Sequence, residues 1–176
     1  MFRMIVISLA VSAVAVPALA ASVRTELQLA TPNGPGRNIG SAVISTGPKG
    51  AVIKLMLHDV PVGEHGLHLH ENGTCMPAAG PDGKPVLAGA AGPHWDPGQS
   101  GHHLGPEGAG HLGDLPRLVV ADKDKGMVRE VMIIPRLSDV AALKGHALML
   151  HTGGDTYSDT PPLGGGGPRL ACGVLK

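Results

Sequence analysis

Six histidines and one aspartate recur in this chain of 176 residues at spacings that suit two metal ions sharing one ligand. They are His68, His70, His94, His103, His111, Asp114 and His151. Sets built from imidazole alone favour copper over zinc at equal access, whereas a set that includes a carboxylate is well suited to zinc. The residues therefore indicate two metal sites of different preference.

The first two histidines belong to the segment 66–71, Gly-Leu-His-Leu-His-Glu. Residues two apart on a strand point to the same face, so Leu67 and Leu69 suit a core while His68 and His70 can reach one ion. Two histidines on a solvated strand face are common in proteins. The pair alone is therefore weak evidence for metal binding.

The segment from Asn72 to Pro116 is rich in Gly and Pro and is long for an ordinary connection, and such loops are usually functional or disordered. It contributes three imidazoles and a carboxylate, a closed tetrahedral set of the kind that zinc accepts in structural sites. A loop with little core of its own could be folded by that ion. The alternative is a mobile surface loop with solvated histidines, and composition alone leaves both interpretations open.

The last histidine of the set, His151, ends the apolar run 145–151. On a strand it shares a face with Ala147 and Met149, while His146 lies on the opposite face. We therefore expect His146 to be a buried, hydrogen-bonded side chain and not a ligand.

The sequence closely resembles the bacterial periplasmic branch of the copper/zinc superoxide dismutases. The resemblance covers nearly the whole chain after residue 20, in the right order, through the motifs at 66–71, 92–94, 103–106, 111–115, 145–151 and 164–174. It implies one copper and one zinc ion per chain. The implied copper ligands are His68, His70, His94 and His151, and the implied zinc ligands are His94, His103, His111 and Asp114.

The resemblance also assigns roles outside the ligand sets. His94 matches the imidazolate that bridges both metals, and Asp155 matches an aspartate that hydrogen-bonds one ligand of each site and so fixes ligand orientation. Arg169 matches the arginine that receives the anionic substrate beside copper. The remaining histidines, which match no ligand position, are expected at the surface or in hydrogen-bonding roles: His58, His65 and His102.

Residues 1–20 are typical of a secretory signal peptide. They combine Arg3, an apolar stretch from Met4 to Val16 and the small-residue cleavage site Ala18-Leu19-Ala20. The apolar stretch is short for a membrane span, so we expect no membrane contact after its removal. The predicted organisation is a signal peptide, 1–20, followed by one superoxide dismutase domain, 21–176, in the periplasm.

The chain contains two cysteines, Cys75 and Cys172. An even pair in an exported protein predicts a disulfide, whereas two buried free thiols would be more usual in the cytosol. In the family that this chain resembles, the matching bridge ties the base of the metal-binding loop to the barrel.

The rest of the sequence predicts an all-β fold, because short apolar segments alternate with Gly/Pro turns, a pattern of sandwiches and flattened barrels. The expected strands are 23–29, 39–45, 52–57, 66–71, 118–121, 127–134, 145–151 and 169–174. The resemblance implies an eight-stranded Greek-key flattened barrel, an immunoglobulin-like sandwich with long metal-binding loops.

The resemblance implies an enzyme that converts two superoxide anions and two protons into dioxygen and hydrogen peroxide, by redox cycling of copper with a structural zinc. A competing hypothesis is a non-catalytic periplasmic copper/zinc-binding protein, which keeps every ligand and predicts no turnover. A zinc hydrolase fits less well, because four protein groups fill the zinc set and leave no position for water.

Lys and Arg balance Asp and Glu at 14 each, and loss of Arg3 would leave a net charge of about −1. The whole protein therefore offers no attraction to the superoxide anion, and steering must come from local charge, with Arg169 as the candidate. Basic patches interleaved with aromatics are absent from the sequence, so no nucleic-acid partner is expected. A homodimer is compatible with the resemblance.

Overall fold

The computed structural model describes residues 21–176, so the predicted signal peptide lies outside the described residues. The described chain contains eleven strands: β1 (Ser22–Thr31), β2 (Gly34–Gly47), β3 (Gly50–Leu57), β4 (Gly63–His65), β5 (Leu67–His70), β6 (Ala78–Ala79), β7 (Pro85–Val86), β8 (Leu118–Val120), β9 (Val128–Ile134), β10 (Ala147–His151) and β11 (Arg169–Val174). Short 3-10 turns occupy Gly89–Ala91, Asp122–Asp124, Ala141–Leu143 and Pro162–Gly165. Within residues 21–176, no helix has the length and apolar character needed to cross a membrane.

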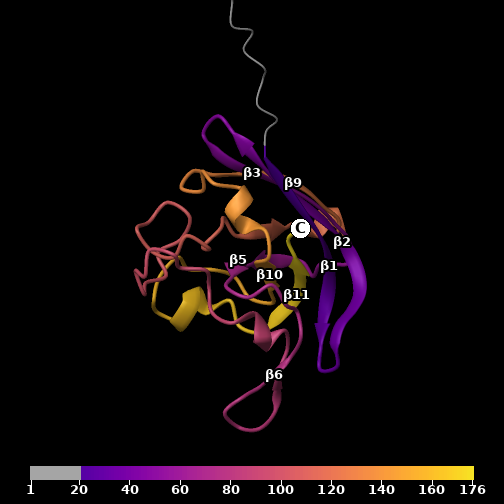
Figure 1. The fold of residues 1–176 in the computed structure, drawn as a ribbon. Coiled ribbons are helices and arrows are strands. Elements are labelled where there is room, and N and C mark those ends of the chain that lie inside the picture. The colour runs from indigo at the N-terminus through magenta and orange to yellow at the C-terminus, as the bar shows by residue number, and fades with distance from the viewer. Residues whose placement is uncertain (1–20) are drawn as a thin grey trace, which may run out of the picture.

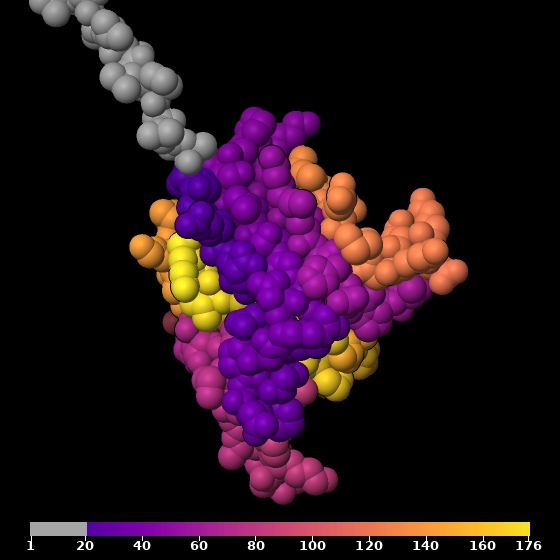
Figure 2. All heavy atoms as spheres, turned by 90° about the vertical axis from the view of Figure 1, so that its right-hand side faces the viewer, coloured from indigo at the N-terminus to yellow at the C-terminus, as the bar shows by residue number. Residues whose placement is uncertain are grey.

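Seven strands form one antiparallel sheet in the order β5-β10-β11-β1-β2-β3-β9, and β4 pairs with β8 in a separate two-stranded sheet. The sheet curls, so that β1, β2, β3 and β9 form a curved layer beside β5, β10 and β11 (Figure 1). Seen from the side of that layer, the indigo and purple strands cover most of the visible face (Figure 2). The β6–β7 hairpin projects from the body. The all-β prediction is confirmed.

All eight predicted strands are present, as β1, β2, β3, β5, β8, β9, β10 and β11. The structure adds three short strands that the sequence pattern did not indicate, β4, β6 and β7. The predicted strand at 118–121 is short and pairs with β4 instead of joining the seven-stranded sheet.

The core is aliphatic and alternates along the strands with the period of two that a half-buried sheet requires. Leu67 and Leu69 of β5 and Leu148 and Leu150 of β10 enter the main core with almost no exposed surface. The opposite face of β10 packs Met149 into a second buried cluster, beside the cysteines. The histidines of β5 therefore leave the main core on the face that the sequence predicted.

A disulfide joins Cys75, near the start of the long loop, to Cys172 in β11, with 5.7 Å between the Cα atoms. The predicted bridge is confirmed, and no free cysteine is present in the described chain. Its 97-residue separation is long enough for the chain-entropy model to give a stabilisation of about 4–5 kcal/mol.

Candidate metal centre

The long loop reaches the histidines of β5 by hydrogen bonding to that strand. β5 is an edge strand of the large sheet, and its Leu69 exchanges backbone hydrogen bonds with the loop: Leu69 N–H donates to Gly113 O at 2.9 Å, and Trp95 N–H donates to Leu69 O at 2.8 Å. These contacts place Asp114 opposite His68 and His94 opposite His70. The loop thus covers an open sheet edge and brings its own ligand candidates to the strand.

The first donor set consists of four buried histidines whose ligand atoms lie within 4.8 Å of one another: His68, His70, His94 and His151. In three of these rings, one nitrogen donates to a protein oxygen. His68 Nε2 donates to Asp155 Oδ2 at 2.7 Å, His70 Nδ1 to Gly92 O at 2.8 Å, and His151 Nδ1 to Gly167 O at 3.0 Å.

The other nitrogen of each of these three rings is buried and has no hydrogen-bond partner within residues 21–176. The bonded nitrogen carries the proton, so the free one carries a lone pair. Three buried lone pairs that face a common space are costly unless something binds them. Neutral imidazoles in this arrangement fit a copper ion.

The second donor set consists of His94, His103, His111 and Asp114, again buried and within 4.8 Å of one another. The Nδ1 atoms of the three histidines lie 3.0, 3.0 and 3.2 Å from one carboxylate oxygen, Oδ1 of Asp114. A tetrahedral zinc ion with bonds of about 2.0–2.1 Å separates its ligands by about 3.3 Å. The donor types and their spacing fit zinc.

His94 belongs to both donor sets. Its Nδ1 faces Asp114, so Nε2 is the nitrogen that remains for the first set. Its ring stacks on that of His68 with 4.0 Å between the centroids. One imidazole therefore lies between the two sets.

Asp155 connects the two sets a second time. Its Oδ2 accepts from His68 Nε2 at 2.7 Å, and its Oδ1 accepts from His103 Nε2 at 2.8 Å. Both hydrogen bonds are fully buried. One carboxylate therefore sets the tautomer and the orientation of one imidazole in each set.

The geometry of the two donor sets agrees with the proteins to which this chain is similar in sequence. A sequence profile described as Copper/zinc superoxide dismutase matches residues 39–175. The chain belongs to the copper/zinc superoxide dismutase family. It is therefore a copper- and zinc-dependent oxidoreductase that acts on superoxide, and the hypothesis of a non-catalytic metal-binding protein is not favoured.

Bacterial members of the family are close in sequence and in structure. The Cu-Zn superoxide dismutases of Brucella abortus and Escherichia coli are each 51% identical to this chain, over 92% and 93% of both chains respectively. The solved Cu/Zn superoxide dismutase from Brucella abortus has a TM-score of 0.84 and 49% identity, covering 89% of this chain and 100% of that one. The monomeric copper, zinc enzyme from Salmonella enterica has a TM-score of 0.77 and 50% identity, over the same shares of the two chains.

Burial keeps the first set of this superoxide dismutase in the metal-binding protonation state. It lowers the pKa of His68 to about 3 and that of His151 to about 4, and it lowers the pKa of His70 well below its usual value. Burial also lowers the pKa of His94. These imidazoles are neutral at pH 7, the form in which imidazole binds a metal.

The second set differs because two carboxylates surround His103. Burial alone would lower the pKa of His103, but the Asp114 carboxylate 3.0 Å from its Nδ1 and the Asp155 carboxylate that accepts from its Nε2 raise it to about 9. Burial alone would raise the pKa of both carboxyls, and their hydrogen bonds with the histidines hold both pKa values well below the usual range. Zinc binding at neutral pH must therefore displace a proton from His103.

A cavity of about 410 Å³ opens onto the first set, with His70, His94, His151 and Arg169 in its wall. The rest of the wall is mainly apolar, from the segments 85–87, 163 and 167–168 and from Pro93. Arg169 is half-buried, and its guanidinium donates to Ala88 O and Gly92 O, both at 2.6 Å. Its charge is therefore held in a fixed position beside His70, which donates to the same Gly92 carbonyl.

The histidines outside the two sets make other contacts. His58 and His102 are exposed and pair with Asp59 and Asp159, and the two ring nitrogens of buried His65 face the carbonyls of His151 and Pro61. These are the surface and hydrogen-bonding roles that we expected.

The prediction for His146 was only partly right. Its Nδ1 donates to His70 O at 3.2 Å, so it is hydrogen-bonded and lies outside both donor sets. However, it is half-exposed and not buried, because it packs against the loop residue Trp95 at the edge of the fold and not inside the core.

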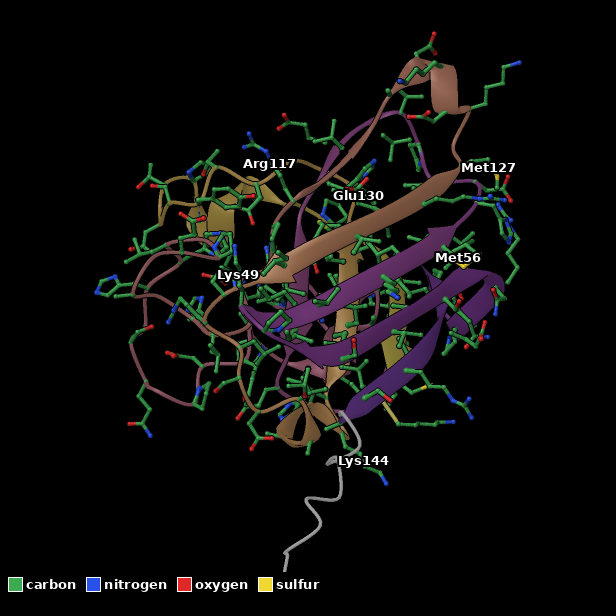
Figure 3. The ribbon with its side chains drawn as sticks, turned by 90° about the horizontal axis from the view of Figure 1, so that it is seen from above. Lys49, Met56, Arg117, Met127, Glu130 and Lys144 are labelled. Carbon is green, nitrogen blue, oxygen red and sulfur yellow. A yellow bond between two sulfur atoms is a disulfide. The ribbon has the colours of Figure 1, made fainter. Side chains whose placement is uncertain are left out.

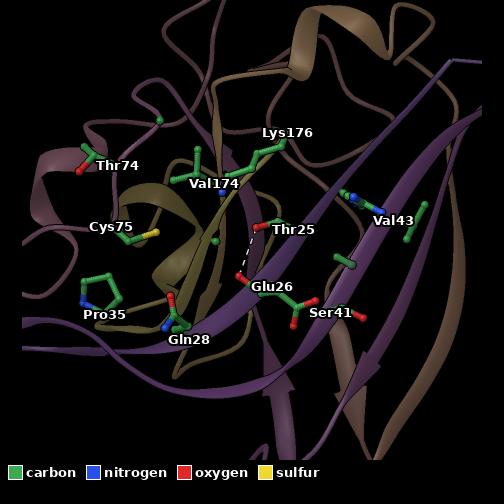
Figure 4. Close-up of a pocket in the computed structure, with 14 residues that line it drawn as sticks. Thr25, Glu26, Gln28, Pro35, Ser41, Val43, Thr74, Cys75, Val174 and Lys176 are labelled. Carbon is green, nitrogen blue, oxygen red and sulfur yellow. Dashed lines mark hydrogen bonds between the residues drawn. The ribbon is translucent and has the colours of Figure 1, made fainter.

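Sequence reasoning missed three residues that support the metal loops: Arg117, Arg136 and Tyr157. None belongs to a ligand motif, and each acts through a contact distant in the chain. A second cavity, of about 760 Å³, lies between β1 and the segment 73–75, and none of its lining residues belongs to either donor set (Figure 4).

Proposed function

We propose that copper is held by His68, His70, His94 and His151, and zinc by His94, His103, His111 and Asp114. The observation that carries this assignment is a set of buried imidazole nitrogens that have no hydrogen-bond partner in the part of the chain that the structure describes, on His68, His70, His103 and His151. Each belongs to one of the two donor sets, and each has its second nitrogen fixed by a protein oxygen.

When bound, copper supplies the one-electron redox chemistry of the dismutation, and zinc supplies a fixed charge beside the shared imidazole. A side chain of the protein holds the proton that the reaction needs. Nε2 of His94 is on the side of the ring that faces the first set, so it can hold a proton and pass it to reduced superoxide. The opposite nitrogen, Nδ1, lies 3.0 Å from Asp114 in the second set, so zinc held there would keep the ring in this orientation.

Arg169 is proposed to receive the anion. A guanidinium stays protonated in proteins and offers fixed donors to a small anion without binding the metal. Its two carbonyl contacts hold it in the wall of the cavity, and the apolar neighbours leave few competing charges there.

We further propose that residues 1–20 are a cleaved signal peptide and that the enzyme, residues 21–176, works in the periplasm. The disulfide supports an oxidising compartment. A homodimer stays a prediction, and both donor sets come from a single chain, so the site does not need a second copy.

Metal analysis together with an activity assay, on protein loaded with both metals, tests the proposal. Asp114→Ala should lose zinc while the first set stays intact, and His58→Gln should keep both metals and full activity because His58 lies outside both sets. Zinc retained at full occupancy in Asp114→Ala would contradict the assignment.

A further inference from the structure

Arg117 contacts the backbone of Asp155 and also contacts Tyr157. Arg117 Nη1 donates to the carbonyl oxygen of Asp155 at 2.9 Å, and the backbone N–H of Arg117 donates to Tyr157 Oη at 2.8 Å. The guanidinium also lies over the Tyr157 ring, 5.3 Å from its centroid. Figure 3 shows Arg117 near the yellow segment that follows β10.

Tyr157 in turn contacts the zinc loop and the Asp155 carboxylate. Its backbone N–H donates to Asp155 Oδ1 at 2.8 Å. A Cβ atom added to Gly105 would lie 2.6 Å from the Tyr157 ring, so the ring lies directly against the loop two residues after His103. Tyr157 adopts a φ of 56°, a conformation that a bulky residue rarely takes. The fold therefore holds this ring in place against an unfavourable backbone.

The two residues join segments that are separate in the chain. Arg117 follows Asp114 by three residues, where the long loop ends, and Asp155 follows His151 by four. We propose that Arg117 and Tyr157 form a clamp that positions Asp155 and, through its carboxylate, orients His68 and His103. They are positioning residues, and the inference rests on the proposed ligand assignment.

The other charged contact of Arg117 does not explain its position. Its Nε lies 3.7 Å from Glu64, and both side chains are largely exposed, at 39% and 51%. Exposed pairs of this kind contribute little to stability. The bond to the Asp155 carbonyl is charge-assisted and lies next to a fully buried carboxylate. It is therefore the contact of Arg117 through which the metal-binding histidines can be positioned.

Arg117→Met tests the clamp and should fold, because Arg117 is exposed. Arg129→Met is the matched control: Arg129 is also exposed, on β9, and no hydrogen bond or ion pair of its side chain is found in the described part of the chain. Zinc release to a chelator should be about tenfold faster in Arg117→Met, the lower end of effects from residues that support metal ligands. With both metals at full occupancy, its copper(II) electron paramagnetic resonance spectrum should also change. Arg129→Met should match wild type in both measurements.

Tyr157→Phe gives an independent variant. It keeps the ring but removes the acceptor for the Arg117 N–H, so zinc release should be about two- to fivefold faster. Arg136→Met separates positioning from general loosening of the loop, because among the described residues the Arg136 side chain donates only to the carbonyls of Gly110 and His111. It should speed zinc release and leave the copper spectrum unchanged.

The outcomes distinguish the clamp from the ligand assignment. If wild-type protein does not bind one copper and one zinc, both the ligand assignment and the clamp are wrong. If wild type binds both metals and Arg117→Met and Tyr157→Phe behave like Arg129→Met, the clamp alone is wrong. The clamp is also wrong if Arg136→Met changes the copper spectrum as Arg117→Met does.

Discussion

Replacing Asp155 with Asn should weaken the binding of copper or zinc by a predictable amount. The carboxylate accepts one hydrogen bond from His68 and one from His103, both buried. An amide of the same shape can accept only one of them, because its NH₂ group faces the other N–H as a second donor. One imidazole must therefore lose its fixed tautomer or turn away.

The structure sets the size of this effect. A hydrogen bond to a charged group contributes about 1.5–3 kcal/mol, and each 1.4 kcal/mol is a factor of ten in affinity. Loss of one such bond predicts that the affinity for one of the two metals falls by roughly 10- to 100-fold, the range seen for residues that support metal ligands. The loss falls on zinc if the amide turns its NH₂ group toward His103, and on copper if it turns that group toward His68.

Competition with a chelator of known affinity measures this change. Asp59→Asn is the matched control, since it removes the same charge at an exposed position that pairs with Arg37. Asp59→Asn should keep wild-type affinity for both metals. Wild-type affinity for both metals in Asp155→Asn would refute the coupling of the two sets through this carboxylate.

Three further predictions follow from the same geometry. Arg169→Ile should lower the dismutation rate at constant metal content, and Arg169→Glu should lower it further. In stopped-flow assays, added salt should slow wild type more than Arg169→Ile. Wild-type activity in Arg169→Glu would show that Arg169 does not guide the anion. Replacing Cys75 and Cys172 with Ser should lower the free energy of unfolding by up to about 4–5 kcal/mol in denaturant titrations, and an unchanged midpoint would contradict the stabilising role of the bridge. Because the pKa of His103 is raised to about 9, its imidazole is protonated at pH 7, so zinc binding there should release close to one proton. That release should disappear as the pH rises through 9, and calorimetry in buffers of different ionisation enthalpy would count the protons; equal release at pH 7 and pH 10 would count against it.

The sequence predicted the strand that carries the first two histidines because its pattern is local. Alternation in the segment 66–71 fixes which side chains enter the core, and Leu67 and Leu69 do so. The same reasoning separated His151 from His146. The pairing of Cys75 with Cys172 needed no geometry, since the chain has no other cysteine.

What the sequence did not predict depends on contacts between distant segments. Backbone bonds from Leu69 to Gly113 and Trp95 place the long loop on β5, and no periodicity within the loop indicates that register. The positions of Arg117 and Tyr157 follow from the approach of that loop to the segment after β10. Short strands such as β4 exist only because a partner is nearby.

The central claim is that two donor sets, sharing His94, hold different metals. Anomalous diffraction from crystals of the metal-loaded enzyme, collected on either side of the copper and zinc absorption edges, tests it most directly. We predict a copper peak bounded by His68, His70, His94 and His151, and a zinc peak bounded by His94, His103, His111 and Asp114. A single shared site, or a metal bound without contact to His94, would contradict the account.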